Sequence, residues 1–110
     1  MKIAYIFESD HALFILDSMI LPQLEKGNHG AQVAGMFFMF DNTFLVEAGN
    51  SVGRRINELA EKTGMLVMAC DQCCYQRTLE GRLIPKAKMG CFPDLYGALG
   101  KVGVDQVITL

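Results

Sequence analysis

The chain has 110 residues, of which 51% are hydrophobic, and its formal net charge is −2. This length supports one hydrophobic core, so we expect a single domain spanning residues 1–110. The ten Lys and Arg residues form no basic stripe, and no apolar run approaches the ~20 residues of a membrane span, so we expect neither nucleic acid nor a membrane as partner.

The first half of the chain alternates strand and helix signals. Residues 2–7 are rich in Ile, Tyr and Phe and predict a strand, and apolar residues at spacings of three and four predict a helix over 13–24. Pro22 is expected to kink or divide that helix, because proline removes a backbone donor and crowds the preceding turn. The apolar segment 31–40 predicts a central strand that is covered on both faces.

The second half continues this alternation, with one stretch that is hard to interpret. Residues 49–51 offer caps for a helix over 52–63, which Gly64 ends, and residues 65–69 predict a third buried strand. Residues 77–93 are ambiguous, and we expect a short strand around Leu83 and Ile84. We expect a last helix that opens at 94–96 and is ended by Gly100 and Gly103, and then a strand over 104–110.

Strands that alternate with helices predict βαβ units and a mostly parallel sheet. We therefore expect an α/β fold, a three-layer sandwich of about five strands with helices on both faces. In such folds ligands gather at the carboxyl ends of the strands. Cys70 directly follows the third predicted strand and falls in that zone.

The most reactive side chains in the sequence belong to a cluster of three cysteines, Cys70, Cys73 and Cys74. No export signal is visible, so we expect a cytoplasmic protein with reduced thiols rather than a disulfide framework. If a helix begins at residue 71 or 72, its backbone N–H groups favour a Cys70 thiolate, and Arg77 is a candidate positive neighbour. The negative charge of Asp71 opposes that effect.

The spacing of the cysteines indicates which of their sulfur atoms can interact. Cys73 lies one helical turn after Cys70, so the two sulfurs can face each other, whereas Cys74 is expected to turn away. Cys91 is a candidate resolving thiol, metal ligand or small core residue. Asp10, after the first strand, either lines the same crevice as Cys70 or caps a helix.

At this point the sequence resembles the DsrE/DsrF-like family of small sulfur-relay proteins, which includes TusD-like subunits. The resemblance spans most of the chain and rests on the order and spacing of five segments. These are the opening strand, Phe37–Asn42 with its aromatic run and acidic residue, Arg55–Leu59, the strand-to-cysteine junction Leu66–Cys70, and Asp105–Ile108.

The resemblance implies that Cys70 matches the persulfide-carrying cysteine and that Cys73 matches a second cysteine of some members. It also implies a homo-oligomer, a trimer or hexamer. The leading hypothesis is therefore a sulfurtransferase-type carrier, with sulfur donor and acceptor proteins as partners and no cofactor. Two alternatives remain open: a non-catalytic oligomer subunit, and a zinc or copper module with ligands from Cys70, Cys73, Cys74, Cys91 and His11.

Overall fold

Five strands form one parallel sheet in the computed structural model, which describes residues 1–110. The strands are β1 (Lys2–Phe7), β2 (Gln32–Phe38), β3 (Leu66–Cys70), β4 (Ala87–Gly90) and β5 (Gln106–Thr109). Their order is β4-β3-β2-β1-β5, and every neighbouring pair is parallel. All five carboxyl ends therefore lie at one edge of the sheet, and β2 is the central strand, as predicted.

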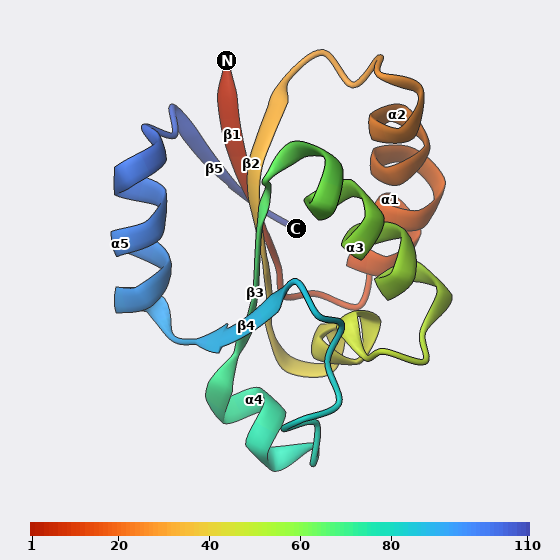
Figure 1. Cartoon of the computed structure of the whole chain (residues 1–110), viewed down its shortest axis with the longest axis vertical. Coiled ribbons are helices and arrows are strands. Elements are labelled where there is room, and N and C mark those ends of the chain that lie inside the picture. The colour runs from red at the N-terminus through yellow and green to blue at the C-terminus, as the bar shows by residue number, and fades with distance from the viewer.

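Helices cover both faces of this sheet (Figure 1). The helical segments are α1 (Ala12–Ile15), the π-helical η1 (Leu16–Ile20), α2 (Leu21–Lys26), the 3-10 helical η2 (Phe40–Val46), α3 (Ser51–Thr63), α4 (Asp71–Gln76) and α5 (Phe92–Val102). Figure 1 shows α1 to α3 on one face, α5 on the other, and α4 beyond the carboxyl edge. The predicted three-layer α/β sandwich is confirmed.

The two faces bury cores of unequal size. The larger core holds 22 buried residues and includes residues of α1, α3 and every strand except β4 and β5. The smaller one has seven buried members: Ala4, Phe37, Met68, Cys70, Cys73, Leu95 and Leu99. Neighbouring residues of β2 alternate between the two, since Met36 and Phe38 enter the larger core and Phe37 the smaller. Because both faces of β2 are buried, its sequence is a continuous apolar run.

Pro22 divides the first helix, as the sequence predicts. The π-helical η1 lies directly before α2, in which Pro22 occupies the first turn. Proline cannot donate to the carbonyl four residues back, so the preceding turn widens and its hydrogen bonds shift. Gly27 then ends α2 in the left-handed conformation, with φ of 73°.

The ambiguous stretch before α5 is where the structure departs from the prediction. Leu83 forms only an isolated antiparallel bridge with Glu47, and the strand at this edge is Ala87–Gly90. Helix α5 begins at Phe92, runs through Gly100 and ends at Gly103. A short edge strand with little apolar character has no local signal, because its pairing with β3 defines it.

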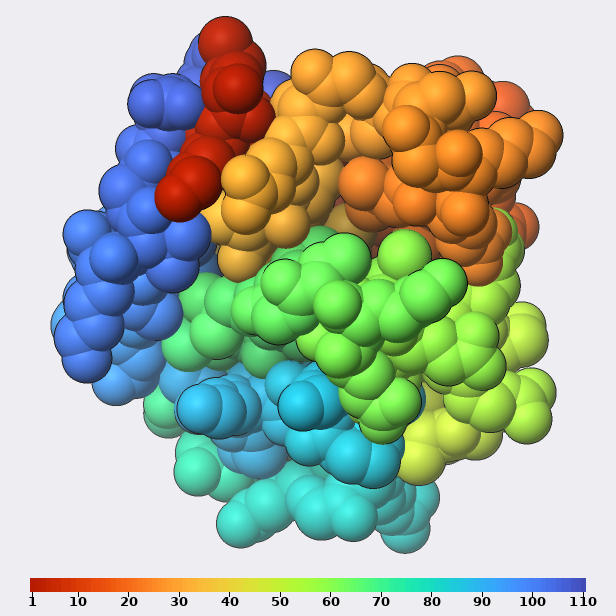
Figure 2. Space-filling model, turned by 45° about the horizontal axis from the view of Figure 1, so that its top comes forward, coloured from red at the N-terminus to blue at the C-terminus, as the bar shows by residue number.

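The first and last strands of the chain lie side by side. Strand β1 pairs with β5, and the backbone N–H of Asp105 donates to the carbonyl of Lys2 at 2.8 Å. In Figure 2 the N-terminal residues (red) accordingly touch the C-terminal segment (blue). None of the helices combines the length and apolar character needed to cross a membrane.

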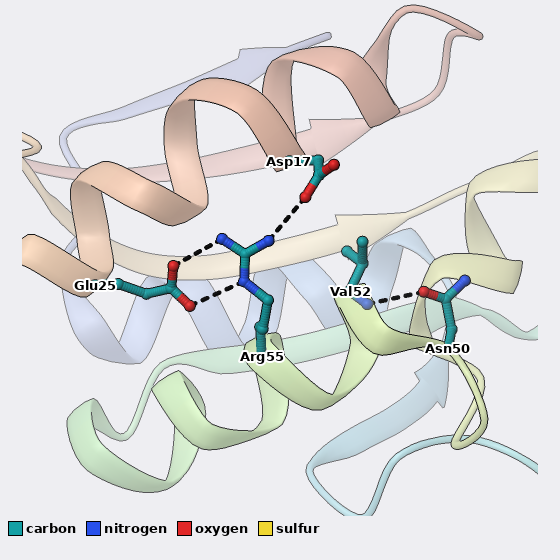
Figure 3. A network of polar contacts seen from close by, with 5 residues as sticks. All are labelled: Asp17, Glu25, Asn50, Val52 and Arg55. Carbon is teal, nitrogen blue, oxygen red and sulfur yellow. Dashed lines mark hydrogen bonds and ion pairs between the residues drawn. The ribbon is translucent and has the colours of Figure 1, made fainter.

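An ion-pair network ties α3 to the first helical segments (Figure 3). The Arg55 guanidinium donates to both carboxylate oxygens of Glu25, at 2.9 and 2.7 Å, and to Asp17 Oδ1 at 2.7 Å. The hydrogen bonds from Arg55 lower the pKa of the Glu25 carboxyl. Glu25 therefore contributes stability above its unfolded-state pKa, and this contribution is lost as pH falls through the lowered folded-state pKa.

We expect Arg55→Gln to lower the free energy of unfolding by about 1 kcal/mol at neutral pH and low salt, because the bidentate pair is only partly exposed. The difference from wild type should shrink in acid and in high salt. Arg54→Gln is the matched control, since exposed Arg54 makes no ion pair. Urea denaturation of the three proteins measures the effect, and equal losses for both variants would contradict it.

Candidate functional site

The cysteine cluster lies where β3 passes into α4. Cys70 is the last residue of β3 and occupies the N-cap position of α4, which begins at Asp71. Its strand partner is Gly90, the last residue of β4. The predicted position of Cys70, at the carboxyl end of the third strand and before a helix, is confirmed.

The three clustered cysteines divide between the two cores. Cys70 and Cys73 pack in the smaller core beneath α5, with 7% and 5% of their surface exposed. Cys74 is fully buried in the larger core. The prediction that Cys74 turns away from the other two is confirmed, because adjacent residues of a helix point in different directions. Cys70 lies at the carboxyl edge of the sheet, where the sequence predicts a ligand site, but its side chain is buried there rather than open to solvent.

Burial also decides the ionisation of Cys70. Loss of solvation raises the pKa of the Cys70 thiol, and the Cys73 side chain raises it further by hydrogen bonding and charge. Backbone N–H groups of Cys73 and Gln72 act in the opposite direction, as the sequence predicts for the start of a helix, but they do not prevail. The expected lowering of the Cys70 pKa is therefore wrong, because desolvation disfavours the thiolate.

The pKa of the Cys74 thiol is raised more strongly than that of Cys70. Burial raises the pKa of its thiol to about 11, and the negative charges of Cys70, Cys73 and Asp71 contribute in the same direction. Cys74 is therefore protonated at neutral pH and serves as a small apolar core residue.

Arg77 does not act as the predicted positive neighbour of Cys70. It lies at the end of α4, where its Nε donates to Asp41 Oδ1 at 2.9 Å and its Nη1 donates to the carbonyl of Cys73 at 3.2 Å. Asp41 balances its charge, and Arg77 is no cause of the Cys70 shift. Arg77 instead links the end of α4 to η2 through its ion pair with Asp41.

Phe40, which our sequence reasoning did not select as a site residue, completes this site. Its backbone N–H donates to Cys73 Sγ at 3.1 Å. Phe40 has a φ of 55°, in the left-handed region that side-chain-bearing residues rarely adopt. No sequence signal predicts that conformation at a phenylalanine. Asp41, by contrast, is the acidic residue that follows the aromatic run in the sequence, and its role in binding Arg77 appears only in the structure.

A pair of substitutions tests whether the positive φ of Phe40 strains the backbone. We expect Phe40→Gly to be more stable than Phe40→Ala by about 1 kcal/mol, because only glycine adopts a positive φ without steric cost. Both variants lose the half-exposed ring, so the comparison isolates the backbone. Chemical denaturation measures the difference, and an alanine variant as stable as the glycine variant would show that no strain is stored here.

The remaining predicted site residues lie apart from the thiol pair. Asp10 and His11 are exposed in the turn after β1, with 3.8 Å between Asp10 Oδ1 and His11 Nε2, and neither bonds a cysteine. Cys91 is half-buried at the N-cap position of α5, where its backbone N–H donates to Asp94 Oδ2 at 2.9 Å. Helix capping therefore accounts for Asp94 and for the position of Cys91.

The alternative metal site finds no support in the side-chain arrangement. No group of three or more His, Cys, Asp or Glu side chains is placed to hold a metal ion. Cys70, Cys73, Cys74 and Cys91 do not converge, because Cys74 enters the opposite core.

A cavity of about 390 Å³ lies at the other end of the sheet, near the amino ends of β2 and β3. Its lining is mostly apolar and includes Leu24, Val33, Leu59 and Met65. None of the predicted site residues lines it, so the cavity and the thiol pair are separate features.

Comparison with solved structures identifies the fold. The chain is similar to the YchN protein from E. coli, with a TM-score of 0.72, 17% sequence identity, and coverage of 100% of this chain and 99% of that chain. It is also similar to a conserved protein of unknown function from Bacteroides thetaiotaomicron, with a TM-score of 0.64, 15% identity, and coverage of 99% and 94%. No family model and no curated protein matches the sequence. These structural similarities, over the whole length of the chain, show that it has a DsrE-like fold.

Proposed function

We propose that this protein is a sulfur-relay protein that carries a persulfide on Cys70. The observation that carries the proposal is the pairing of Cys70 and Cys73, one helical turn apart and in one core cluster, at the carboxyl edge of a DsrE-like sheet. In the proposed reaction the Cys70 sulfur attacks the outer sulfur of a donor persulfide, and the donor thiolate leaves. The outer sulfur then passes to an acceptor protein or to Cys73.

Two features support this assignment. Cys70 ends a strand at the edge where open α/β sheets bind their ligands. The backbone of Cys73 and of Gln72 acts to lower the pKa of the Cys70 thiol, although burial has the larger effect. The donor and acceptor are therefore proteins that present a persulfide or thiol to this edge, and neither a metal nor an organic cofactor is required.

The competing candidate is an oligomer subunit in which the thiols only pack. The observation in its favour is the burial of Cys70, Cys73 and Cys74. Under that assignment all three thiols react slowly with an alkylating reagent in the native protein, and no sulfur is acquired from a donor.

Incubation with a cysteine desulfurase and cysteine, followed by intact mass spectrometry, tests the proposal. We expect wild type to gain one sulfur atom and Cys70→Ser to gain none. Cys91→Ser is the control and should gain sulfur as wild type does, because its side chain lies outside the pair. A wild type that gains no sulfur, or a Cys70→Ser variant that gains as much, contradicts the proposal.

We also propose that the protein forms a homo-oligomer, a trimer or hexamer. Apolar side chains remain exposed on α5 and on the edge strand β5, namely Tyr96, Val102 and Val107. A single helix covers that face of the sheet, which leaves apolar surface for a second copy. Sedimentation equilibrium measures the oligomeric state, and a monomer at high concentration would contradict it.

A further inference from the structure

Strand β5 is an edge strand with one open side. It pairs with β1 alone, in a register that continues without a shift along the whole strand. Just after it, the Leu110 N–H donates to the Ile6 carbonyl at 2.7 Å, and the Leu110 carbonyl accepts the N–H of Glu8 at 2.7 Å. Peptide groups of successive strand residues alternate in direction. The N–H and carbonyl groups of Val107 and Thr109 therefore point away from β1, where no strand of the chain pairs with them.

The other edge of the sheet, at β4, carries features that discourage pairing, and β5 does not. Lys88 is an exposed charge within β4, and Pro85 lies two residues before that strand. Charged side chains and proline keep an edge strand from pairing with another chain. Strand β5 has the sequence Gln-Val-Ile-Thr, with neither charge nor proline, and three of its four residues are exposed. Its open side is therefore free to pair.

A second copy of β5, in the antiparallel direction, fits this open side. A twofold axis perpendicular to the sheet through Ile108 places Val107 opposite Thr109 of the second copy, and the outward N–H and carbonyl groups of both residues then pair. An axis through Val107 would instead place Thr109 opposite Asp105, whose N–H already donates to the Lys2 carbonyl at 2.8 Å. Only the axis through Ile108 satisfies every outward-pointing group of β5.

The side chains around this axis suit contact with a second copy. Ile108 is partly buried against the larger core, and the two copies of it form a non-hydrogen-bonded pair, in which opposite side chains are closest. On the other face, Val107 lines a groove of about 390 Å³ together with Tyr96 and Leu99. Tyr96 and Val107 are 63% and 46% exposed. Pairing of the strands brings apolar surface of the second copy against both faces.

The charges nearest β5 do not oppose this pairing, because both are engaged within the chain. The Asp105 carboxylate accepts the backbone N–H of Lys2 at 2.8 Å, and the Lys2 ammonium donates to the Val102 carbonyl at 3.2 Å. No residue of β5 itself is charged. A second copy of the strand therefore meets no like charge, which is the usual barrier to self-association at a sheet edge.

We propose that two copies of this chain associate by antiparallel pairing of their β5 strands, which joins the two sheets into one. This inference rests on the homo-oligomer proposed above and identifies one of its contacts as twofold, so it fits a hexamer with three such contacts and excludes a trimer. Because the two sheets run in opposite directions, their carboxyl edges lie on opposite sides of the joined sheet. The two pairs of Cys70 and Cys73 are then far apart, and neither obstructs access to the other.

Disulfide cross-linking in a Cys91→Ser background tests the register. We expect Ile108→Cys to form a covalent dimer under mild oxidation, because opposite Cα atoms of a non-hydrogen-bonded pair lie about 4.5 Å apart, within reach of a disulfide. Val107→Cys is the matched control and should cross-link at least about tenfold more slowly, since its two copies are diagonal neighbours about 7 to 8 Å apart. Val107→Cys cross-linking as fast as Ile108→Cys, or no cross-linking of either, overturns the proposed pairing.

The mass of the assembly tests the same contact without a new thiol. Val107→Pro removes an outward-pointing N–H but no hydrogen bond to β1, so the mass measured by sedimentation equilibrium should fall to half that of wild type. Val107→Thr keeps the N–H and should keep the wild-type mass. A Val107→Pro variant with the wild-type mass, or a wild type that is a monomer or trimer, overturns the inference. If Val107→Pro does not fold, the cross-linking result decides.

Sulfur loading is a separate measurement, so the two proposals can fail independently. An even-numbered oligomer that fails both tests loses only the β5 contact and keeps the proposed assembly and persulfide. A wild type that acquires no sulfur loses the persulfide function, whereas cross-linking of Ile108→Cys still supports the contact.

Discussion

Replacing Gly53 with alanine is expected to lower the free energy of unfolding by about 2 to 3 kcal/mol, although alanine is the better helix former. Gly53 lies in α3, and a Cβ there would be 2.7 Å from the Leu45 carbonyl oxygen and 2.9 Å from that of Glu47. These atoms belong to backbone and cannot rotate away. The cost is therefore a displacement of α3 from η2 and the segment that follows it, which thermal or urea denaturation measures.

Gly97→Ala is the matched control for that prediction. Gly97 also lies within a helix, α5, but a Cβ there meets no atom within 4 Å. We expect this variant to gain up to about 1 kcal/mol, because alanine loses less backbone entropy than glycine on forming a helix. The same substitution in two helices should thus change stability in opposite directions, and two shifts of the same sign would refute the close approach at Gly53.

Alkaline pH is expected to remove about 2 to 3 kcal/mol of stability through Cys74 alone. The pKa of its thiol is about 11 in the folded protein, against an ordinary value of 9.0. The folded-state pKa is raised, so this stability is fully present below pH 9 and is lost as pH rises toward 11. In that window the unfolded chain releases the Cys74 proton while the folded chain retains it.

Cys74→Ala isolates this contribution from other groups that titrate in base, such as Tyr5, whose pKa burial also raises. The variant should be less stable than wild type at neutral pH, because a buried sulfur is lost, and its stability should fall less between pH 9 and 11. Urea denaturation across this range gives both curves. Parallel curves would show that Cys74 does not titrate in the unfolding transition.

The amino-acid sequence by itself determined the layout of the fold. The strand over residues 2–7 has the predicted bounds, and the third strand differs from its prediction by one residue at each end. In α3, Asn50 Oδ1 accepts the N–H of Val52 at 2.9 Å, and Gly64 ends the helix with a φ of 75°. These features depend on residues a few positions apart, so periodicity and capping preferences suffice to predict them.

Local geometry also placed the cysteines correctly along the chain. Cys70 had to follow a buried strand, and Cys74 had to point away from Cys73 because neighbours on a helix diverge. What local geometry could not supply was the environment of each sulfur. Whether a thiol at a strand end is open or covered depends on segments that pack over it.

Only the tertiary structure decided the chemistry of the site. Leu95 and Leu99 of α5 pack in the core that buries Cys70, and the N–H of Phe40 reaches Cys73 across 33 positions in sequence. Arg77 is bound by Asp41, 36 positions away, which removes it as a free positive charge. Solvation and electrostatic fields act through space, so the pKa of a thiol depends on whichever distant segments fold against it.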